Sequence, residues 1–209
     1  MGSDIQGRLV ALAVASALGL AGCDGSTPSG GTDAGPDIML PDTGAAGCSV
    51  PTSGFGTSVG RNFSPITLTS CDGSSYEFYG TAEGYCDASL TVVMIAAGWC
   101  GPCRREAMLM ETFLTQRYAP HRVRVLVAIT QNNDYEAPSL AFCEGWVAQY
   151  ALTNPVTIDP TQETQVYFPG NALPATLIVD ATGRIVHREY GVSNDLETVR
   201  AELDRLLGL

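Results

Sequence analysis

The sequence has no lysine, only two histidines, and arginine at all eleven of its cationic positions. The missing lysine excludes a Schiff-base amine and the lysine of a phosphate-binding loop. A formal net charge of −11, with no basic stripe, argues against a nucleic-acid partner. The hydrophobic fraction of 45% is normal for a globular protein, so the chain can bury a core.

An apolar run at residues 9–20 follows Arg8 and is too short to span a membrane comfortably, but it suits the core of a signal peptide. It ends in the tetrapeptide Leu-Ala-Gly-Cys at positions 20–23, which resembles the bacterial lipobox, whose cysteine is lipidated and becomes the new N-terminus. We therefore expect residues 1–22 to be a lipoprotein signal peptide and Cys23 to carry the lipid. An ordinary signal peptide or a short buried helix, with Cys23 incidental, is the alternative.

The segment after Cys23 is built from Gly, Ser, Thr, Pro, Ala and Asp, with four Asp and no basic residue between positions 24 and 47. Such a composition cannot offset its ordering entropy, which predicts a disordered tether over residues 23–47. Residues 48–209 then form one folded domain. The predicted location is the bacterial cell envelope, with this domain in the periplasm or outside the cell.

Hydrophobic patterning within 48–209 predicts an α/β fold, with a central mixed sheet, flanking helices and an N-terminal β-hairpin. Asp72-Gly73 separates the two strands of that hairpin, and the last helix is predicted to begin at Asn194, with Glu197 completing a capping box. Further strands are expected at residues 90–97, 123–129, 156–158, 176–179 and 184–188, and helices at 101–118, 139–151 and 161–167.

The motif Trp99-Cys100-Gly101-Pro102-Cys103 falls where the apolar strand at 90–97 gives way to a helix. Two cysteines three positions apart in a first helical turn can bring their sulfurs within bonding range. The first sulfur also faces unpaired backbone N–H groups and the positive end of the helix dipole, which lower the pKa of a thiol. Pro102 can start the helix without loss of a hydrogen bond, because the backbone N–H that proline lacks would have no partner at this position. The preceding strand, Trp99, the Gly-Pro dipeptide and the following helix together favour a redox-active pair of cysteines.

Two other interpretations of this motif are weaker. Half of a zinc site needs a second cysteine pair or histidines nearby, but the other cysteines are widely spaced and His121 and His187 are isolated. A purely structural disulfide rarely occupies a strand-to-helix turn next to a tryptophan. We therefore predict no metal and no organic cofactor.

The sequence resembles proteins of the thioredoxin fold, and more closely the extracytoplasmic TlpA/ResA-like thiol–disulfide oxidoreductases. The resemblance covers roughly residues 60 to 208. It rests on Asn62-Phe63 through Leu68 with Asp72-Gly73, on the segment 99–106, and on residues 173–180 before Gly183.

The resemblance implies a role for each motif residue. Cys100 would be the attacking cysteine and Cys103 the resolving one, exchanging with protein thiols and disulfides of the envelope through a mixed disulfide. Pro174 would be cis and, with Leu173, would dock the substrate chain opposite the redox pair, where Trp99, Gly101 and Pro102 complete the site. A membrane electron donor or acceptor and a monomeric state are also expected.

Some positions depart from the thioredoxin pattern, and two of them bear on the redox pair and its helix. Met94 replaces the buried aspartate that would accept the proton of Cys103, which leaves Glu106 as a weak candidate for that role. Met108 replaces the proline that normally kinks the active-site helix, so we expect the kink to be missing.

Four cysteines lie outside the motif and after Cys23, and four cysteines allow three pairings. Structural disulfides are the default in an exported domain. Cys71 and Cys86 flank the hairpin and its exit, which predicts a Cys71–Cys86 bond, and Cys48–Cys143 follows by elimination. Alternatively, Cys143 is a third redox thiol.

Two further functions compete with the oxidoreductase. A thiol peroxidase of the peroxiredoxin type needs a P-x-x-x-T-x-x-C arrangement, but Val93 and Ala97 occupy the proline and threonine positions. A non-enzymatic lipoprotein that carries copper or is purely structural is the other possibility, and copper carriage usually adds a histidine near the thiols, for which His187 is the candidate.

Overall fold

The computed structural model describes residues 50–191 and 196–209. The predicted signal peptide, lipidation at Cys23, tether, and the positions of Cys48 and Asn194 lie outside these residues. Within them, no helix is both long and apolar enough to cross a membrane.

A seven-stranded mixed sheet forms the centre of the domain, in the order β2-β1-β5-β4-β3-β6-β7. The central strands β3, β4 and β5 are parallel, and every other pairing is antiparallel. β3 is buried along its whole length, as its continuous apolar sequence predicts. The strands are β1 (Thr67–Ser70), β2 (Ser75–Glu77), β3 (Leu90–Ala96), β4 (Val123–Ile129), β5 (Val156–Ile158), β6 (Ala175–Asp180) and β7 (Ile185–Tyr190).

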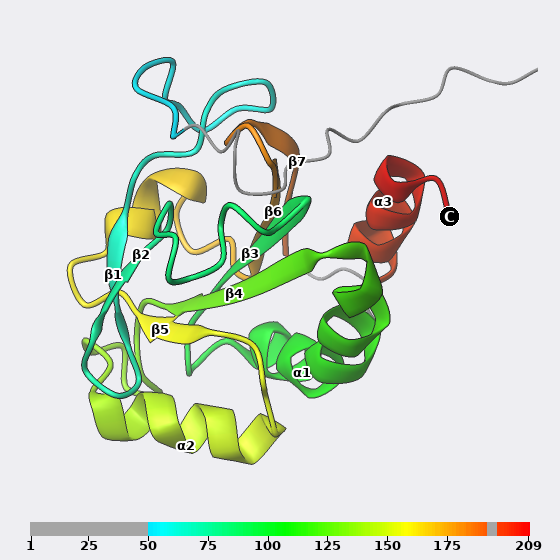
Figure 1. The fold of residues 1–209 in the computed structure, drawn as a ribbon. Helices are drawn as coiled ribbons and strands as arrows, with labels where there is room; N and C mark the ends of the chain where they lie inside the picture. The colour runs from blue at the N-terminus through cyan, green and yellow to red at the C-terminus, as the bar shows by residue number, and fades with distance from the viewer. Residues whose placement is uncertain (1–49, 192–195) are drawn as a thin grey trace, which may run out of the picture. The chain divides into compact units, whose positions relative to one another are not determined.

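Helices α1 (Gly101–Met110) and α2 (Leu140–Tyr150) connect the three parallel strands. The steps from β3 to β4 and from β4 to β5 run in the same direction across the sheet. Right-handed crossovers therefore place α1 and α2 on the same face, as Figure 1 shows. Shorter helical turns are η1 (Glu111–Gln116), η2 (Ala119–His121) and η3 (Glu163–Tyr167).

The C-terminal helix α3 (Glu197–Leu207) packs beside the end of the α1–η1 segment. The Tyr118 hydroxyl donates to Asp204 Oδ1 at 2.7 Å, and Arg117 Nη2 lies 3.2 Å from Asp204 Oδ2. The guanidinium of Arg200 lies 4.8 Å from the centre of the Phe113 ring. These contacts join the last helix to the segment that begins at the predicted redox pair.

A cluster of aromatic rings packs around the segment that joins β2 to β3. Phe63 stacks on Tyr167 of η3 with ring centres 4.4 Å apart, and its ring also lies 4.3 Å from Phe78. Arg124, from β4, reaches this cluster and donates to the carbonyls of Phe78 and Glu83. Its half-buried guanidinium is therefore satisfied by backbone oxygens, as a cation withdrawn from water requires.

The predicted elements are confirmed, with small changes at their ends. The strands at 123–129 and 156–158 begin and end where predicted, and Ser139 caps α2 by accepting a hydrogen bond from Phe142 N at 3.2 Å. The segment predicted as helical at 161–167 is a 3₁₀ turn that begins only at Glu163. Helix α1 has Met108 in place of the kinking proline, but the hydrogen bonding of this segment changes from α-helical to π-helical at Glu111.

Candidate active site

Cys100 and Cys103 form a disulfide at the N-terminus of α1, with their Cα atoms 5.3 Å apart. Cys100 is the N-cap of this helix, and its Sγ accepts a hydrogen bond from Cys103 N at 3.1 Å. Cys103 is fully buried, and Cys100 is 3% exposed. The first sulfur thus faces the unpaired N–H groups and the positive end of the helix dipole, as the spacing predicts.

Trp99 is held against the loop that follows β4. Its Nε1 donates to Gln131 Oε1 at 2.9 Å, and its ring stacks on Tyr135 with centres 4.9 Å apart and planes 18° from parallel. Gln131 Nε2 in turn donates to the Tyr135 carbonyl at 2.9 Å. Tyr135 is 63% exposed and has a φ of 65°, which is uncommon for a bulky residue. The two stacked rings form an aromatic surface beside the disulfide.

Gly98 allows this loop to come close to the end of β3. A Cβ atom at this position would lie 2.6 Å from Phe142 Cζ and 2.8 Å from both Asn132 C and Asn133 N. Two of these atoms belong to the backbone, so a larger residue would push the loop away. The glycine therefore sets the distance between the loop and the motif.

Pro174 lies at the same end of the sheet as the disulfide. The antiparallel register pairs Ala175 with Ile95, so Pro174 precedes β6 where β3 leads into the motif. The Leu173–Pro174 peptide bond is cis. Leu173 N donates to Asn171 O at 2.8 Å, and the Pro174 carbonyl accepts from Gly191 N at 2.8 Å.

Two buried side chains near the motif bear on proton transfer. Met94 of β3 is 1% exposed and provides no titratable group. Glu106, three residues after Cys103 on α1, is 3% exposed. Residues three apart on a helix share a face. A carboxyl group thus lies on the Cys103 face of the helix, within the protein interior.

The predicted pairing of the other cysteines is wrong. Cys71 is bonded to Cys143, with Cα atoms 5.2 Å apart, and not to Cys86. Both sulfurs lie near the Val156 carbonyl, at 3.4 Å from Cys71 and 3.8 Å from Cys143. The reason is the strand order: β1 pairs with β5, which follows α2, so the hairpin lies next to α2.

The Cys71–Cys143 bond also excludes the predicted Cys48–Cys143 pair and leaves no free thiol at Cys143 in this structure. Cys86 is itself disulfide-bonded. His187, the candidate histidine for copper carriage, is on β7 opposite Ile178, where its Nε2 lies 3.5 Å from Glu189 Oε2. Because β6 separates β7 from β3, this histidine is distant from the motif.

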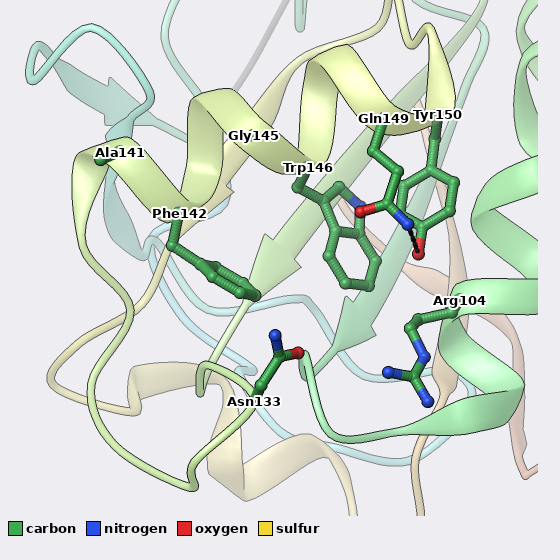
Figure 2. A pocket seen from close by; sticks show the side chains of 8 residues that line it. All are labelled: Arg104, Asn133, Ala141, Phe142, Gly145, Trp146, Gln149 and Tyr150. Atoms are coloured by element: carbon green, nitrogen blue, oxygen red, sulfur yellow. Dashed lines mark hydrogen bonds between the residues drawn. The ribbon is translucent and has the colours of Figure 1, made fainter.

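A groove of about 380 Å³ lies between α1 and α2. Figure 2 shows Trp146 and Tyr150 extending from α2 toward Arg104, with Asn133 on the facing side. Arg104 directly follows Cys103, so this groove adjoins the disulfide. Trp146 is 4% exposed and belongs to the core, yet it also lines this groove. The sequence did not reveal the groove or the contribution of Tyr135. The aromatic spacing of Phe142, Trp146 and Tyr150, at every fourth position, was the available signal.

The sequence matches the redoxin family over residues 60–207, and the chain therefore belongs to the redoxin family. Its fold is thioredoxin-like, as predicted, with the sheet and helices of thiol–disulfide oxidoreductases. Comparison with curated protein sequences gives no match.

Solved structures support this fold. A secreted Mycobacterium tuberculosis disulfide oxidoreductase homologous to E. coli DsbE gives 16% identity and a TM-score of 0.51, covering 66% of this chain and 96% of that one. The thioredoxin domain of a Bacteroides vulgatus thiol-disulfide oxidoreductase gives 14% identity, TM-score 0.53, and coverage of 71% and 99%. The M. tuberculosis peroxidoxin BcpB gives 13% identity, TM-score 0.58, and coverage of 72% and 99%. At these identities the likeness concerns the fold alone.

Proposed function

We propose that this protein is an extracytoplasmic thiol–disulfide oxidoreductase that exchanges the Cys100–Cys103 pair with exported proteins. The observation that carries the proposal is the disulfide at the N-terminus of α1, with Cys100 as the helix cap. Membership of the redoxin family supports oxidoreductase chemistry. Val93 and Ala97, where a peroxiredoxin-type motif needs proline and threonine, disfavour the peroxidase alternative.

The chemistry follows from the helix position. In the reduced protein, the N-terminus of α1 stabilises the Cys100 thiolate. This thiolate attacks a substrate disulfide, forming a mixed disulfide and releasing one substrate sulfur as a thiolate. Cys103 then loses its proton and attacks the Cys100 sulfur, which releases the second substrate sulfur. The substrate gains two electrons and the pair is oxidised; the reverse sequence oxidises a substrate dithiol.

The substrate chain docks between the motif and the loop before β6. In this arrangement Leu173 and Pro174 offer their backbone, and Trp99, Gly101 and Pro102 form the opposite side. Support comes from the β3–β6 register, which brings both segments to the same end of the sheet. Each turnover then needs a membrane electron donor or acceptor to restore the pair.

Glu106 is our candidate for the proton acceptor of Cys103, because it is buried on the same helix face and Met94 cannot take this role. Glu106→Gln should slow the resolving step and shift the pH profile of substrate release. Glu106→Asp, which keeps the carboxyl group, should restore part of the rate. An unchanged pH profile in Glu106→Gln would contradict the assignment.

Trapping of the mixed disulfide tests the oxidoreductase. Full-length Cys103→Ser should accumulate a covalent complex with a disulfide-bonded protein, because the resolving thiol is missing. Cys100→Ser, which retains the other cysteine, is the matched control and should form no such complex. If both variants behave alike and neither loses exchange activity, the proposed function is wrong.

The anchor is tested separately. We propose that Cys23 carries a lipid and holds the domain at a bacterial membrane, with residues 23–47 as its tether. Cys23→Ser should move the protein from the membrane fraction to the soluble fraction and abolish incorporation of labelled fatty acid. Retention of the label in that variant would exclude Cys23 as the lipidated residue.

A further inference from the structure

The groove between α1 and α2 is rich in hydrogen-bond donors and lacks acidic side chains. Its lining residues are Arg104, Asn133, Ala141, Phe142, Gly145, Trp146, Gln149 and Tyr150. None of them is Asp or Glu, in a chain that has 22 acidic residues. The polar groups that this wall offers a ligand are a guanidinium, two amides, a hydroxyl and the indole N–H of Trp146.

The arrangement at Tyr150 adds a donor to this wall. Gln149 Nε2 donates to the Tyr150 hydroxyl at 3.1 Å, as Figure 2 shows. Because the hydroxyl oxygen accepts this bond, its own hydrogen remains available to donate. Tyr150 extends from α2 toward Arg104, so the hydroxyl and the guanidinium can bind the same acceptor.

Arg104 takes part in none of the ion pairs found among residues 50–191 and 196–209. The ion pairs found there are Arg117–Asp204, Arg205–Glu202 and His187–Glu189. Arg104 itself is exposed on α1. Its charge also opposes the rise in pKa that burial gives Tyr150, consistent with the two side chains facing each other. The groove thus presents a positive charge that forms no ion pair within the described part of the chain.

The floor of the groove is aromatic. Phe142, Trp146 and Tyr150 follow one another at every fourth position of α2, with ring centres 6.1 Å and 4.8 Å apart. These rings can cover the methylene groups of a ligand whose charged end reaches Arg104. The groove volume of about 380 Å³ is near the lower limit for ligand pockets. It leaves room for one or two amino-acid side chains.

The groove is next to the sulfurs that would react. Arg104 directly follows Cys103, and the Asn133 backbone packs against Gly98, two residues before Cys100. A polypeptide held in a mixed disulfide with Cys100 would therefore pass close to the groove with the residues that flank its own cysteine.

We propose that this groove binds a carboxylate side chain, Asp or Glu, that lies near the reacting cysteine of the substrate polypeptide. Arg104 binds the carboxylate, Tyr150 and Asn133 donate further hydrogen bonds, and the α2 rings cover the aliphatic stem. This inference rests on the proposed function and adds a substrate preference to it. The preference opposes the overall charge of −11, which would otherwise repel acidic partners.

The test uses reduced full-length protein and paired disulfide-containing peptides. Each pair differs only by Glu or Gln at one position within three residues of the reacting cysteine, and the second-order rate constant of exchange is measured for both. For at least one position, the Glu peptide should react about threefold to tenfold faster, the range of a charge-assisted contact at a partly exposed site. The ratio should fall as salt is added.

The matched variants are Arg104→Gln and Arg184→Gln. Both remove one positive charge, but Arg184 is exposed on the β6–β7 turn and does not line the groove. Arg104→Gln should bring the Glu-to-Gln rate ratio close to one, and Arg184→Gln should leave it unchanged. The ratio is informative because any effect of Arg104 on the Cys100 thiolate changes both peptides equally.

The outcomes separate the two proposals. Exchange with Glu and Gln peptides at equal rates would overturn the groove assignment and leave the oxidoreductase intact. A ratio that persists in Arg104→Gln would also overturn it, because another cation would then be responsible. If no peptide reacts with the wild-type protein, the proposed function and this inference fail together.

Discussion

Removal of the Cys71–Cys143 bond should reduce the stability of the domain substantially. The bond joins residues 72 positions apart, connecting the N-terminal hairpin to α2. In the chain-entropy relation, a loop of this length contributes about 4 kcal/mol to the free energy of unfolding. This is an upper estimate, because Cys86 lies within the loop and is also disulfide-bonded. The same relation gives about 2 kcal/mol for the short loop between Cys100 and Cys103.

The experiment compares Cys71→Ala/Cys143→Ala with the wild-type protein by urea unfolding, followed by circular dichroism. Under oxidising conditions the double variant should lose about 4 kcal/mol, and about twice as much as Cys100→Ala/Cys103→Ala. Cys143 is fully buried, so part of the loss could come from packing. Repeating both measurements with reductant isolates that part, because the crosslink is then absent from both proteins.

Two results would refute this reasoning. The first is a difference below about 1 kcal/mol under oxidising conditions, which is far below the loop-closure contribution. The second is an equal difference with and without reductant, which would assign the whole effect to packing. Peptide mapping of the oxidised protein provides an independent check, since it should recover Cys71 linked to Cys143.

Other substitutions test the surroundings of the motif. Gly98→Ala should lower the free energy of unfolding by about 2 kcal/mol, measured in urea, because the backbone must move to relieve the close contacts. Tyr135→Asn keeps a residue that tolerates positive φ but removes the stack, so Trp99 fluorescence should shift to longer wavelength with little loss of stability; an unchanged spectrum would contradict the stack. The hydrogen bond from Tyr118, partly opposed by burial, lowers the pKa of Asp204 from its ordinary 3.8. Tyr118→Phe should therefore cost about 1 kcal/mol at neutral pH. The Tyr118 hydroxyl also lies 3.1 Å from the Arg200 carbonyl, which does not titrate. Because the ionised carboxylate is the form stabilised in the folded state, the part of the difference that comes from Asp204 should disappear as the pH falls through the lowered pKa, below 3.8. A difference that is constant from pH 7 to pH 2 in thermal unfolding would argue against it.

The sequence predicted those parts of the fold and site that depend on local pattern. The apolar run before Trp99, rich in β-branched residues, predicted a strand buried on both faces, and the C-x-x-C spacing with Pro102 placed the helix start correctly. The boundaries of β4 and β5 also followed from their apolar residues.

The features that the sequence did not predict depend on strand order. The disulfide prediction failed because Cys71 is near Cys86 along the chain but lies next to α2 in the sheet order. The Trp99–Tyr135 stack and the groove depend on how closely the 131–139 loop approaches β3, a distance set by Gly98. Met108 offers no sign of the π-helical turn that starts three residues later.

The attachment of α2 has a consequence for how this domain can diversify. The helix is fastened to the hairpin by its own crosslink, whereas the redox pair is carried by β3 and α1. In the proposed groove, α2 carries the aromatic wall, whereas α1 carries both Arg104 and the end of the redox pair. A graft of the α2 face from a related protein should therefore change the aromatic wall of the groove while leaving Arg104 and the redox pair in place on α1.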